Sequence, residues 1–416
     1  MESIEPGGAA REIIAALEAN GHEAWIVGGC VRDALMGRAP DDLDIATDAL
    51  PGETERIFKK TAPTGRKYGT VTVITALGSA EVTTFRGEER YDGSRRPSSL
   101  RFGVCIREDL ARRDFTVNAM AYNPRRGLLD PFGGHDDIER GLIRAAGDPE
   151  ARFAEDPLRI LRAFRFAAKL GFAIESGTLA AAEKCMPLCS SLSGERIRGE
   201  LERMLMSDEP ERAICLVQLG LFDAVGVPRA ERGKDISFAS VPRDIRARWA
   251  AFAVASGCDT TKLFERLKFS NTLERDVSLL LRELRVMPPE TPVGIKSRLG
   301  EVRPELFRLY ILTYAALSGS DQSAVLAQLD GVLSRREPYT IAMLPIDGND
   351  LACEGVPRGP EIGRMLSKAL VMAIDDPGLG RDGILRALWL EPAGKRIESG
   401  RKSLSSDKIE DKRSGS

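Results

Sequence analysis

The chain has 416 residues, of which 43% are hydrophobic and 29% are charged, a composition typical of a globular protein with roughly two to four structural units. It contains no run of about 18 or more apolar residues, which argues against a membrane-spanning helix, and its acidic first residues do not resemble a secretory signal. Two histidines are too few for a hydrolase built on a His/Asp metal cluster, and a net charge of −2 excludes a uniformly basic protein that coats nucleic acid.

The first predicted elements are a strand and a helix joined by glycines. Residues 24–27 (AWIV) are apolar and long enough for a buried strand, and Gly28 and Gly29 follow them directly. Apolar residues then recur at helical spacing, which predicts a short helix over 30–36 that Gly37 would end. Glycines at such a turn let a triphosphate approach the backbone, and the positive end of the helix favours an anion.

A second strand is predicted over 42–47, where polar and apolar residues alternate. This period places Asp42 and Asp44 on one face, and paired carboxylates can bind hard cations such as magnesium through oxygen. Arg32, one turn into the preceding helix, is placed to reach the same phosphates. Each feature alone is more often an ordinary turn or strand edge, but together they predict a two-metal site. One ion would activate an attacking hydroxyl and the other would hold the triphosphate.

A hairpin and a long loop come next. The β-rich runs 69–76 and 81–86 predict the hairpin, on which Glu81 is either a third metal-binding carboxylate or an exposed strand residue. Residues 87–103 are polar, basic and rich in Gly, Pro and Ser. They predict a long loop, and loops of this length are usually functional or disordered.

Helices dominate the rest of the chain. After a partly helical segment, 109–123, and a short strand in 127–134, the helical pattern extends from about residue 150 to 392. The end of the chain has almost no apolar residues, which predicts disorder. The predicted fold class is therefore α+β, a small sheet-containing head on a mostly helical remainder. The predicted domains are the catalytic head 1–145, a helical neck 146–215, a helical body and tail 216–392, and a disordered end 393–416.

One predicted helix, within 155–172, carries a basic stripe. Asp156 and Pro157 form an ordinary helix start, with Asp as the N-cap and Pro at the first helical position. Arginines follow at steps of three, while apolar residues cover the other faces. The stripe either faces solvent on a capped helix or faces nucleotide and phosphate. Its members are Arg159, Arg162 and Arg165.

These motifs resemble those of the class II tRNA nucleotidyltransferase/poly(A) polymerase family, within the DNA-polymerase-beta-like superfamily. GGCVRDALMG, followed three residues later by DDLD, resembles the first motif of the family, and RRDFTVNAMAYN its second. DPFGGHDDIERGLIRAAGDP is similar to its hinge segment, EDPLRILRAFRFAAKLGF to its nucleotide-selecting helix and GERIRGEL to its last motif. A looser similarity to the helical tail of these enzymes extends over 345–366. The common order of the motifs makes the resemblance specific.

The resemblance implies an enzyme that attaches cytidine, cytidine and adenosine to the 3′ end of tRNA without a nucleic-acid template. The substrates would be CTP and ATP, the metal Mg²⁺ and the leaving group pyrophosphate. The glycine turn and Arg32 would contact the phosphates, Asp42 and Asp44 would hold magnesium, and a further set would surround the nucleotide. The implied nucleotide-binding residues are Gly28, Gly29, Arg32, Arg113, Asp156, Arg159, Arg162 and Arg165.

The selecting helix also suggests how bases are chosen. Cytosine and adenine both place an exocyclic amine donor beside a ring-nitrogen acceptor, which complements one carboxylate and one guanidinium. Asp156 is expected to accept from the amine and Arg159 to donate to the ring nitrogen. Uracil and guanine reverse this order and would leave buried polar groups opposed.

Other functions remain open. A poly(A) polymerase of the same family would suit a long basic C-terminal extension, whereas this end is short and mixed in charge. A partial enzyme would add only CC or only A, and the loop 87–103 argues against the CC-only type, which lacks such a loop in this family. A non-catalytic RNA-binding protein is disfavoured by the intact pair Asp42 and Asp44.

The remaining expectations concern partners and environment. Residues 345–392 are expected to grip tRNA at its elbow, away from the 3′ end, and the oligomeric state is left open. The seven cysteines are scattered without paired metal spacing. They predict a reducing, cytoplasmic location without structural zinc. The absence of a long apolar run predicts no membrane partner.

Overall fold

The computed structural model describes residues 7–40, 42–87, 101–230 and 233–390, and everything below refers to these ranges. The chain divides into two compact units. The first contains the residues up to Met287 together with Leu312–Ser320, and the second contains Pro288–Ile311 and the residues from Asp321 onward. None of the helices in the described ranges is both long and apolar enough to cross a membrane.

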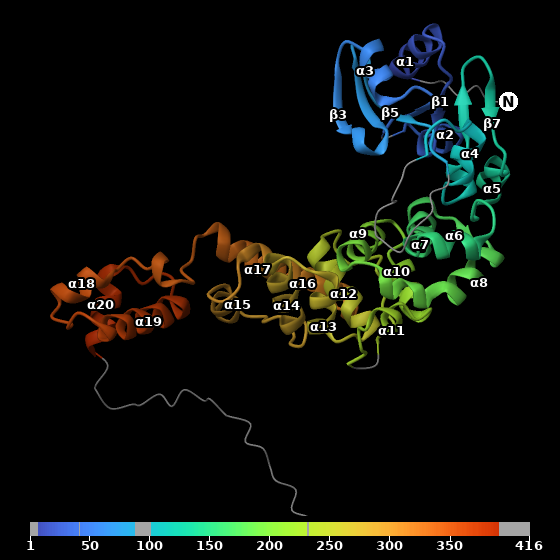
Figure 1. Ribbon diagram of the computed structural model, residues 1–416. Helices are drawn as coiled ribbons and strands as arrows, with labels where there is room; N and C mark the ends of the chain where they lie inside the picture. The colour runs from blue at the N-terminus through green and yellow to red at the C-terminus, as the bar shows by residue number, and fades with distance from the viewer. Residues whose placement is uncertain (1–6, 41, 88–100, 231–232, 391–416) are drawn as a thin grey trace, which may run out of the picture. The chain divides into compact units, whose positions relative to one another are not determined.

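The head is built around a mixed sheet with the strand order β3-β4-β5-β2-β1-β6-β7 (Figure 1). At its centre, β1 (Ala24–Val27) runs antiparallel to β2 (Asp44–Thr47). On its other side β2 pairs in parallel with β5 (Gly78–Thr84), and this register places Asp44 opposite Glu81. The two acidic residues that the sequence assigned to neighbouring strands therefore lie side by side.

The predicted hairpin is present and is formed by β4 and β5. β5 begins earlier than expected, at Gly78, because its pairing with β4 continues to the turn, where Thr75 lies opposite Gly78. The predicted loop 87–103 lies outside the described residues at 88–100, while its ends are joined by a hydrogen bond from the Gly87 N–H to the Arg101 carbonyl at 3.0 Å. The outer strands are β3 (Thr61–Gly65), β4 (Thr70–Thr75), β6 (Ala121–Asn123) and β7 (Gly127–Leu129).

Apolar side chains cover both faces of the sheet. On one face, Ile13 and Leu17 of α1 (Gly8–Ala19) are buried against strand residues that include Ile26 and Ile45. The other face has its own buried cluster, in which Trp25, Ala46 and Phe85 meet the short helix α4 (Ile106–Ala111). β2 is thus buried on both sides, which anchors the strand from which Asp44 projects.

The rest of the chain is helical apart from the short pair β8 (Leu142–Ile143) and β9 (Ala173–Ile174). This confirms the α+β class. The remaining α-helices of the first unit are α2 (Gly29–Leu35), α3 (Pro51–Ile57), α5 (Gly134–Arg140), α6 (Pro149–Glu155), α7 (Leu158–Leu170), α8 (Ser176–Cys185), α9 (Gly194–Leu205), α10 (Arg212–Gln218), α11 (Leu221–Val225), α12 (Ile245–Ser256), α13 (Thr260–Leu267) and α14 (Asn271–Glu283). Beyond α14 the chain forms α15 (Pro292–Leu299), α16 (Pro304–Ser318), α17 (Ser323–Ser334), α18 (Gly348–Cys353), α19 (Pro360–Asp375) and α20 (Arg381–Leu390). Short 3-10 helices are η1 (Arg66–Tyr68), η2 (Thr116–Asn118), η3 (Met186–Ser191) and η4 (Ile341–Met343).

Candidate active site

A cavity of about 580 Å³ is lined by the glycine turn, the central strands and the neck helices α7 and α9. Its lining carries more arginines than carboxylates, a balance that favours an anionic ligand. The arginines are Arg32, Arg86, Arg112, Arg113, Arg159, Arg162 and Arg196, and the carboxylates are Asp44, Glu81, Asp109, Asp114 and Asp156. The cavity thus brings together residues from the first, second and last motifs and from the helix with the arginine stripe, whereas its lining includes none from the hinge segment 130–149.

The glycine turn has a steric reason. Gly28 adopts φ 74°, a conformation that L side chains rarely adopt, and a Cβ there would lie 2.7 Å from Nη1 of Arg113. Gly29 begins α2, one residue before the predicted helix start. Glycine at position 28 therefore lets the guanidinium of Arg113 lie directly against the backbone of the turn.

A chain of hydrogen bonds connects this turn to α7. Arg32 is buried, and it donates to Asp33 at 2.8 Å and to Asn118 at 2.6 Å. Asn118 in turn donates to Oδ1 of Asp114 at 3.2 Å, and Nε of Arg162 donates to Oδ2 of Asp114 at 2.8 Å. Burial acts to raise the pKa of Asp114, but the charge and hydrogen bond of Arg162 hold it below its ordinary value. The arginines of the head and of the neck are thus positioned by one ionised carboxylate.

Asp109 positions the two arginines of the second motif, Arg112 and Arg113. Its side chain is buried and accepts from Arg112 at 3.1 Å, from Arg113 at 3.2 Å and from the Arg86 N–H at 3.1 Å. Burial opposes ionisation, yet these partners keep the pKa of Asp109 below its ordinary value. Arg112 and Arg113 are therefore not free surface charges, because both pair with a buried carboxylate at the cavity.

Phe166 holds several guanidinium groups on one ring. The Cζ atoms of Arg165, Arg162 and Arg32 lie 3.9, 5.4 and 5.6 Å from its centroid. Sequence reasoning missed this residue. Its position four residues after Arg162 on α7 was the available signal, since such residues are neighbours on a helix surface.

Arg165 is not among the residues that line the cavity. Its Nε donates to the buried carboxylate of Glu200 on α9 at 2.5 Å, so the side chain joins α7 to α9. The drift of the arginine stripe explains this outcome. Steps of three residues fall short of a helical turn, so the third arginine has rotated away from Arg159.

The predicted base-reading pair is present, with each member held by other neighbours. Arg159 donates to Glu155 at 2.6 Å and to the Arg112 carbonyl at 3.0 Å, while the Asp156 carboxylate accepts from Arg196 at 2.8 and 3.1 Å. The predicted N-cap is shifted. Pro157 is the N-cap of α7, although Oδ1 of Asp156 still accepts the Leu158 N–H at 3.2 Å.

The acidic side of the site lies at the start of β2. Asp44 and Glu81 line both the cavity of about 580 Å³ and a neighbouring one of about 540 Å³, which Asp42 also lines. The prediction that Asp42 and Asp44 share a strand face is wrong, because β2 begins at Asp44. The buried thiol of Cys30 accounts for this by donating to the Asp42 carbonyl at 3.0 Å and accepting from the Asp44 N–H at 3.1 Å.

The electrostatics of Asp44 suit a cation. Burial raises the pKa of this carboxyl, the charges of Glu81 and Asp42 raise it further, and Arg113 opposes them. A bound divalent ion would relieve this repulsion, and carboxylate oxygens are the ligands that magnesium prefers. The residues present therefore fit a magnesium site.

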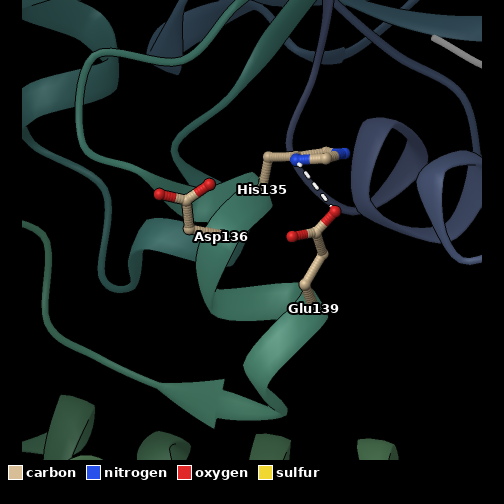
Figure 2. Close-up of side chains that lie close together, drawn as sticks. All are labelled: His135, Asp136 and Glu139. Carbon is tan, nitrogen blue, oxygen red and sulfur yellow. Dashed lines mark ion pairs between the residues drawn. The ribbon is translucent and has the colours of Figure 1, made fainter.

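A different cluster has more closely spaced ligand atoms. Within the described ranges, the group of histidine, cysteine and carboxylate residues whose ligand atoms all lie within 4.8 Å is His135, Asp136 and Glu139 (Figure 2). His135 Nδ1 and Glu139 Oε1 lie 3.8 Å apart on the seven-residue helix α5. None of these residues lines either cavity of the site.

Two family models match the chain. The model of the Poly A polymerase head domain matches residues 24–144, the region of the sheet and of the glycine turn. The model described as "Probable RNA and SrmB- binding site of polymerase A" matches residues 171–227, in the helices that follow α7.

Curated proteins extend this similarity over most of the chain. The CCA-adding enzyme of Limosilactobacillus fermentum (strain NBRC 3956 / LMG 18251) is 35% identical over 367 residues, which are 86% of this chain and 90% of that protein. The CCA-adding enzyme of Geobacillus sp. (strain WCH70) is 36% identical over 373 residues, 87% of this chain and 91% of that protein.

Solved structures of CCA-adding enzymes are also similar to this chain. The crystal structure of the Bacillus stearothermophilus CCA-adding enzyme in complex with CTP has a TM-score of 0.78 and 31% identity, covering 91% of this chain and 96% of that one. The Thermotoga maritima CCA-adding enzyme complexed with tRNA_CCA has a TM-score of 0.65 and 22% identity, covering 92% and 94%. At that identity the second likeness concerns the fold alone.

Proposed function

The chain belongs to the CCA-adding enzymes, which confirms the family resemblance of its motifs, and from this premise we propose its substrates and the role of each site residue. The substrates proposed are CTP, ATP and the 3′ end of tRNA, with pyrophosphate as the leaving group. The observation that carries the proposal is the arginine-rich cavity between the glycine turn and α7. CTP is the ligand of the related Bacillus stearothermophilus enzyme.

In this proposal the phosphates lie against the glycine turn. Gly28 and Gly29 allow close approach, and Arg32 and Arg113 supply positive charge at that point. Because Asp109 and Asn118 already hold these arginines, little side-chain freedom is lost when the triphosphate binds.

Magnesium would be held by Asp42 and Asp44. When bound, it would neutralise developing charge on the phosphates and lower the pKa of the attacking 3′ hydroxyl of tRNA. Glu81 lies opposite Asp44 in the sheet register and is the available third carboxylate. The chain's own contribution is to hold the loop before β2 through Cys30, so that both carboxylates remain at the cavity edge.

Base choice is assigned to Asp156 and Arg159 at the start of α7. The carboxylate would accept from the exocyclic amine of cytosine or adenine, and the guanidinium would donate to the ring nitrogen. Arg162 would contribute positive charge nearby. For Arg165 we propose an indirect role, because its guanidinium is directed to Glu200 and to the ring of Phe166.

We also propose the functional divisions expected from the sequence. The head 1–145 would catalyse, the neck 146–215 would select the nucleotide, and the region 216–392 would bind tRNA, with 345–392 at the elbow. The segment 393–416 lies outside the described residues. The cytoplasmic location stays a proposal that is based on the scattered cysteines.

The test is a nucleotide-addition assay with each NTP on tRNA that ends at the discriminator base, in C or in CC. We expect CMP on the first two substrates and AMP on the third. Long AMP tracts on unrelated RNA would indicate a poly(A) polymerase instead. Addition confined to CC or to A would indicate a partial enzyme, and no transfer at saturating magnesium would contradict the proposal.

A further inference from the structure

We propose that Arg196 is a positioning residue that holds the Asp156 carboxylate in the orientation that reads the nucleobase. This inference rests on the proposed function, in which Asp156 accepts from the exocyclic amine. It goes beyond that function by giving Arg196, a cavity-lining residue outside the predicted nucleotide-binding set, a role in base choice.

The contact involves both carboxylate oxygens. Nη2 of Arg196 donates to Oδ2 of Asp156 at 2.8 Å and to Oδ1 at 3.1 Å, and Oδ1 also accepts the Leu158 N–H at 3.2 Å. A carboxylate has about four lone-pair sites, so these contacts leave an accepting position on Oδ2. Since both side chains line the cavity, this position is available to a bound base.

The backbone that carries Arg196 is placed by contacts away from the cavity. A Cβ at Gly194, the first residue of α9, would lie 2.0 Å from the Arg266 carbonyl oxygen, so only glycine allows this close approach. Arg266 also donates to the Leu192 carbonyl at 2.9 Å. Arg196 lies in the first turn of α9, so this packing fixes the position of its backbone and thereby the direction from which its side chain reaches Asp156.

Asp156 needs such a partner. It is the C-cap of α6, just before α7, where no helix interior restrains its rotamer. Among the described residues, Arg196 is the side chain found to donate to it. The side chain of Asp156 is 25% exposed, so without Arg196 the carboxylate would rotate toward water and away from the base.

The experiment measures kcat/KM for CTP and UTP on tRNA lacking its CCA end, with Asp156→Ala, Arg196→Ala and the double variant. We expect Arg196→Ala to lower the CTP/UTP ratio about tenfold, the loss of one oriented hydrogen bond. In the Asp156→Ala background, Arg196→Ala should change the ratio no further. Arg196→Lys should restore part of the ratio, because an ammonium can replace donation from a single nitrogen.

Arg203→Ala is the matched control. Arg203 is on the same helix, is 64% exposed and pairs with Glu200 instead of Asp156, so its loss removes the same charge without altering the ratio.

Several outcomes would overturn the inference. If Asp156→Ala lowers the ratio and Arg196→Ala does not, Asp156 reads the base without Arg196. If Arg196→Ala lowers the ratio equally with and without Asp156, Arg196 acts on the base itself. If Asp156→Ala leaves the ratio unchanged, the proposed base reader is wrong and the inference falls with it. If Arg196→Ala does not fold, Arg196→Lys decides, because a purely structural role predicts a lower melting temperature at an unchanged ratio.

Discussion

The charged groups on the two sides of the candidate active-site cavity lie in opposite electrostatic surroundings. On the arginine side, Asp109 and Asp114 are buried with guanidinium partners, and the pKa of each lies below its ordinary value. On the acidic side, Asp44 is half-buried beside other carboxylates, and its pKa is raised. Paired charges stabilise the fold and fix geometry, whereas mutually repelling charges are held at a cost that a ligand can relieve. The difference separates carboxylates that are already paired with arginines in the fold from carboxylates that remain available to a bound cation.

Removing a charge on the acidic side should produce the largest effect on activity. Asp44→Asn is expected to reduce transfer of both CMP and AMP by about three orders of magnitude or more, because both steps share the same displacement at the α-phosphate. The melting temperature in magnesium-free buffer should stay equal or rise, since a half-buried carboxylate next to Glu81 has lost its charge. Nucleotide-addition assays and thermal unfolding measure the two effects.

Asp42→Ala should cause a similar loss of activity, and Asp136→Ala is the control for a surface carboxylate outside the cavity. Substantial activity of Asp42→Ala or Asp44→Asn at saturating magnesium would contradict the assignment of the metal to these residues.

Asp156 combines the two situations, because its carboxylate is paired with Arg196 and is also proposed to contact the substrate. Its substitution therefore tests both roles. Asp156→Ala removes one acceptor from a partly desolvated site, a loss of roughly 1–3 kcal/mol, or about one to two orders of magnitude in kcat/KM for CTP. UTP should be affected less, because its O4 is an acceptor that the carboxylate repels. Kinetics with both nucleotides, next to a melting curve, separate this from a helix-start role, which would affect both nucleotides in equal proportion.

On the arginine side the expected effect is on stability and its pH dependence. Asp114→Asn breaks the pair with Arg162, which is about a third exposed, so we expect a loss of about 1–3 kcal/mol at neutral pH. Because the pKa of Asp114 is lowered in the fold, its contribution is present above its ordinary pKa and is lost as pH falls through the folded value.

Denaturant unfolding between pH 7 and 3 measures this dependence. The wild type should lose stability below about pH 4 more steeply than Asp114→Asn. Parallel curves for the two proteins would show that the ionised carboxylate does not stabilise the fold.

The smallest effect on catalysis is expected at Arg165. Arg165→Gln should change kcat/KM for CTP by less than about threefold, since the side chain does not line the cavity. The loss of one charged partner of the buried Glu200 carboxylate should lower the melting temperature. Arg162→Gln is the matched comparison from the cavity-lining part of the stripe. If Arg165→Gln reduced nucleotide use as strongly as Arg162→Gln, the distinction between the two arginines would be wrong.

Local pattern was enough for much of the fold. The apolar run 24–27 forms β1 as predicted, and the runs 69–76 and 81–86 form the hairpin. Strand alternation and helical spacing depend on neighbouring residues, so they can be recognised without the rest of the chain. The motifs of the head and neck likewise identified the family, because their order is a property of the chain itself.

What only the tertiary structure decided is which charges have partners. Arg32 reaches Asn118 and Arg162 reaches Asp114 across long stretches of chain, and the stripe divides between the cavity and Glu200. The conformation of the loop before β2 is set by its hydrogen bonds to the thiol of Cys30 and not by the alternation of polar and apolar residues. Such choices depend on how α7, α9 and the sheet pack, because the energy of a buried charge is set by what surrounds it in space and not by its neighbours in sequence.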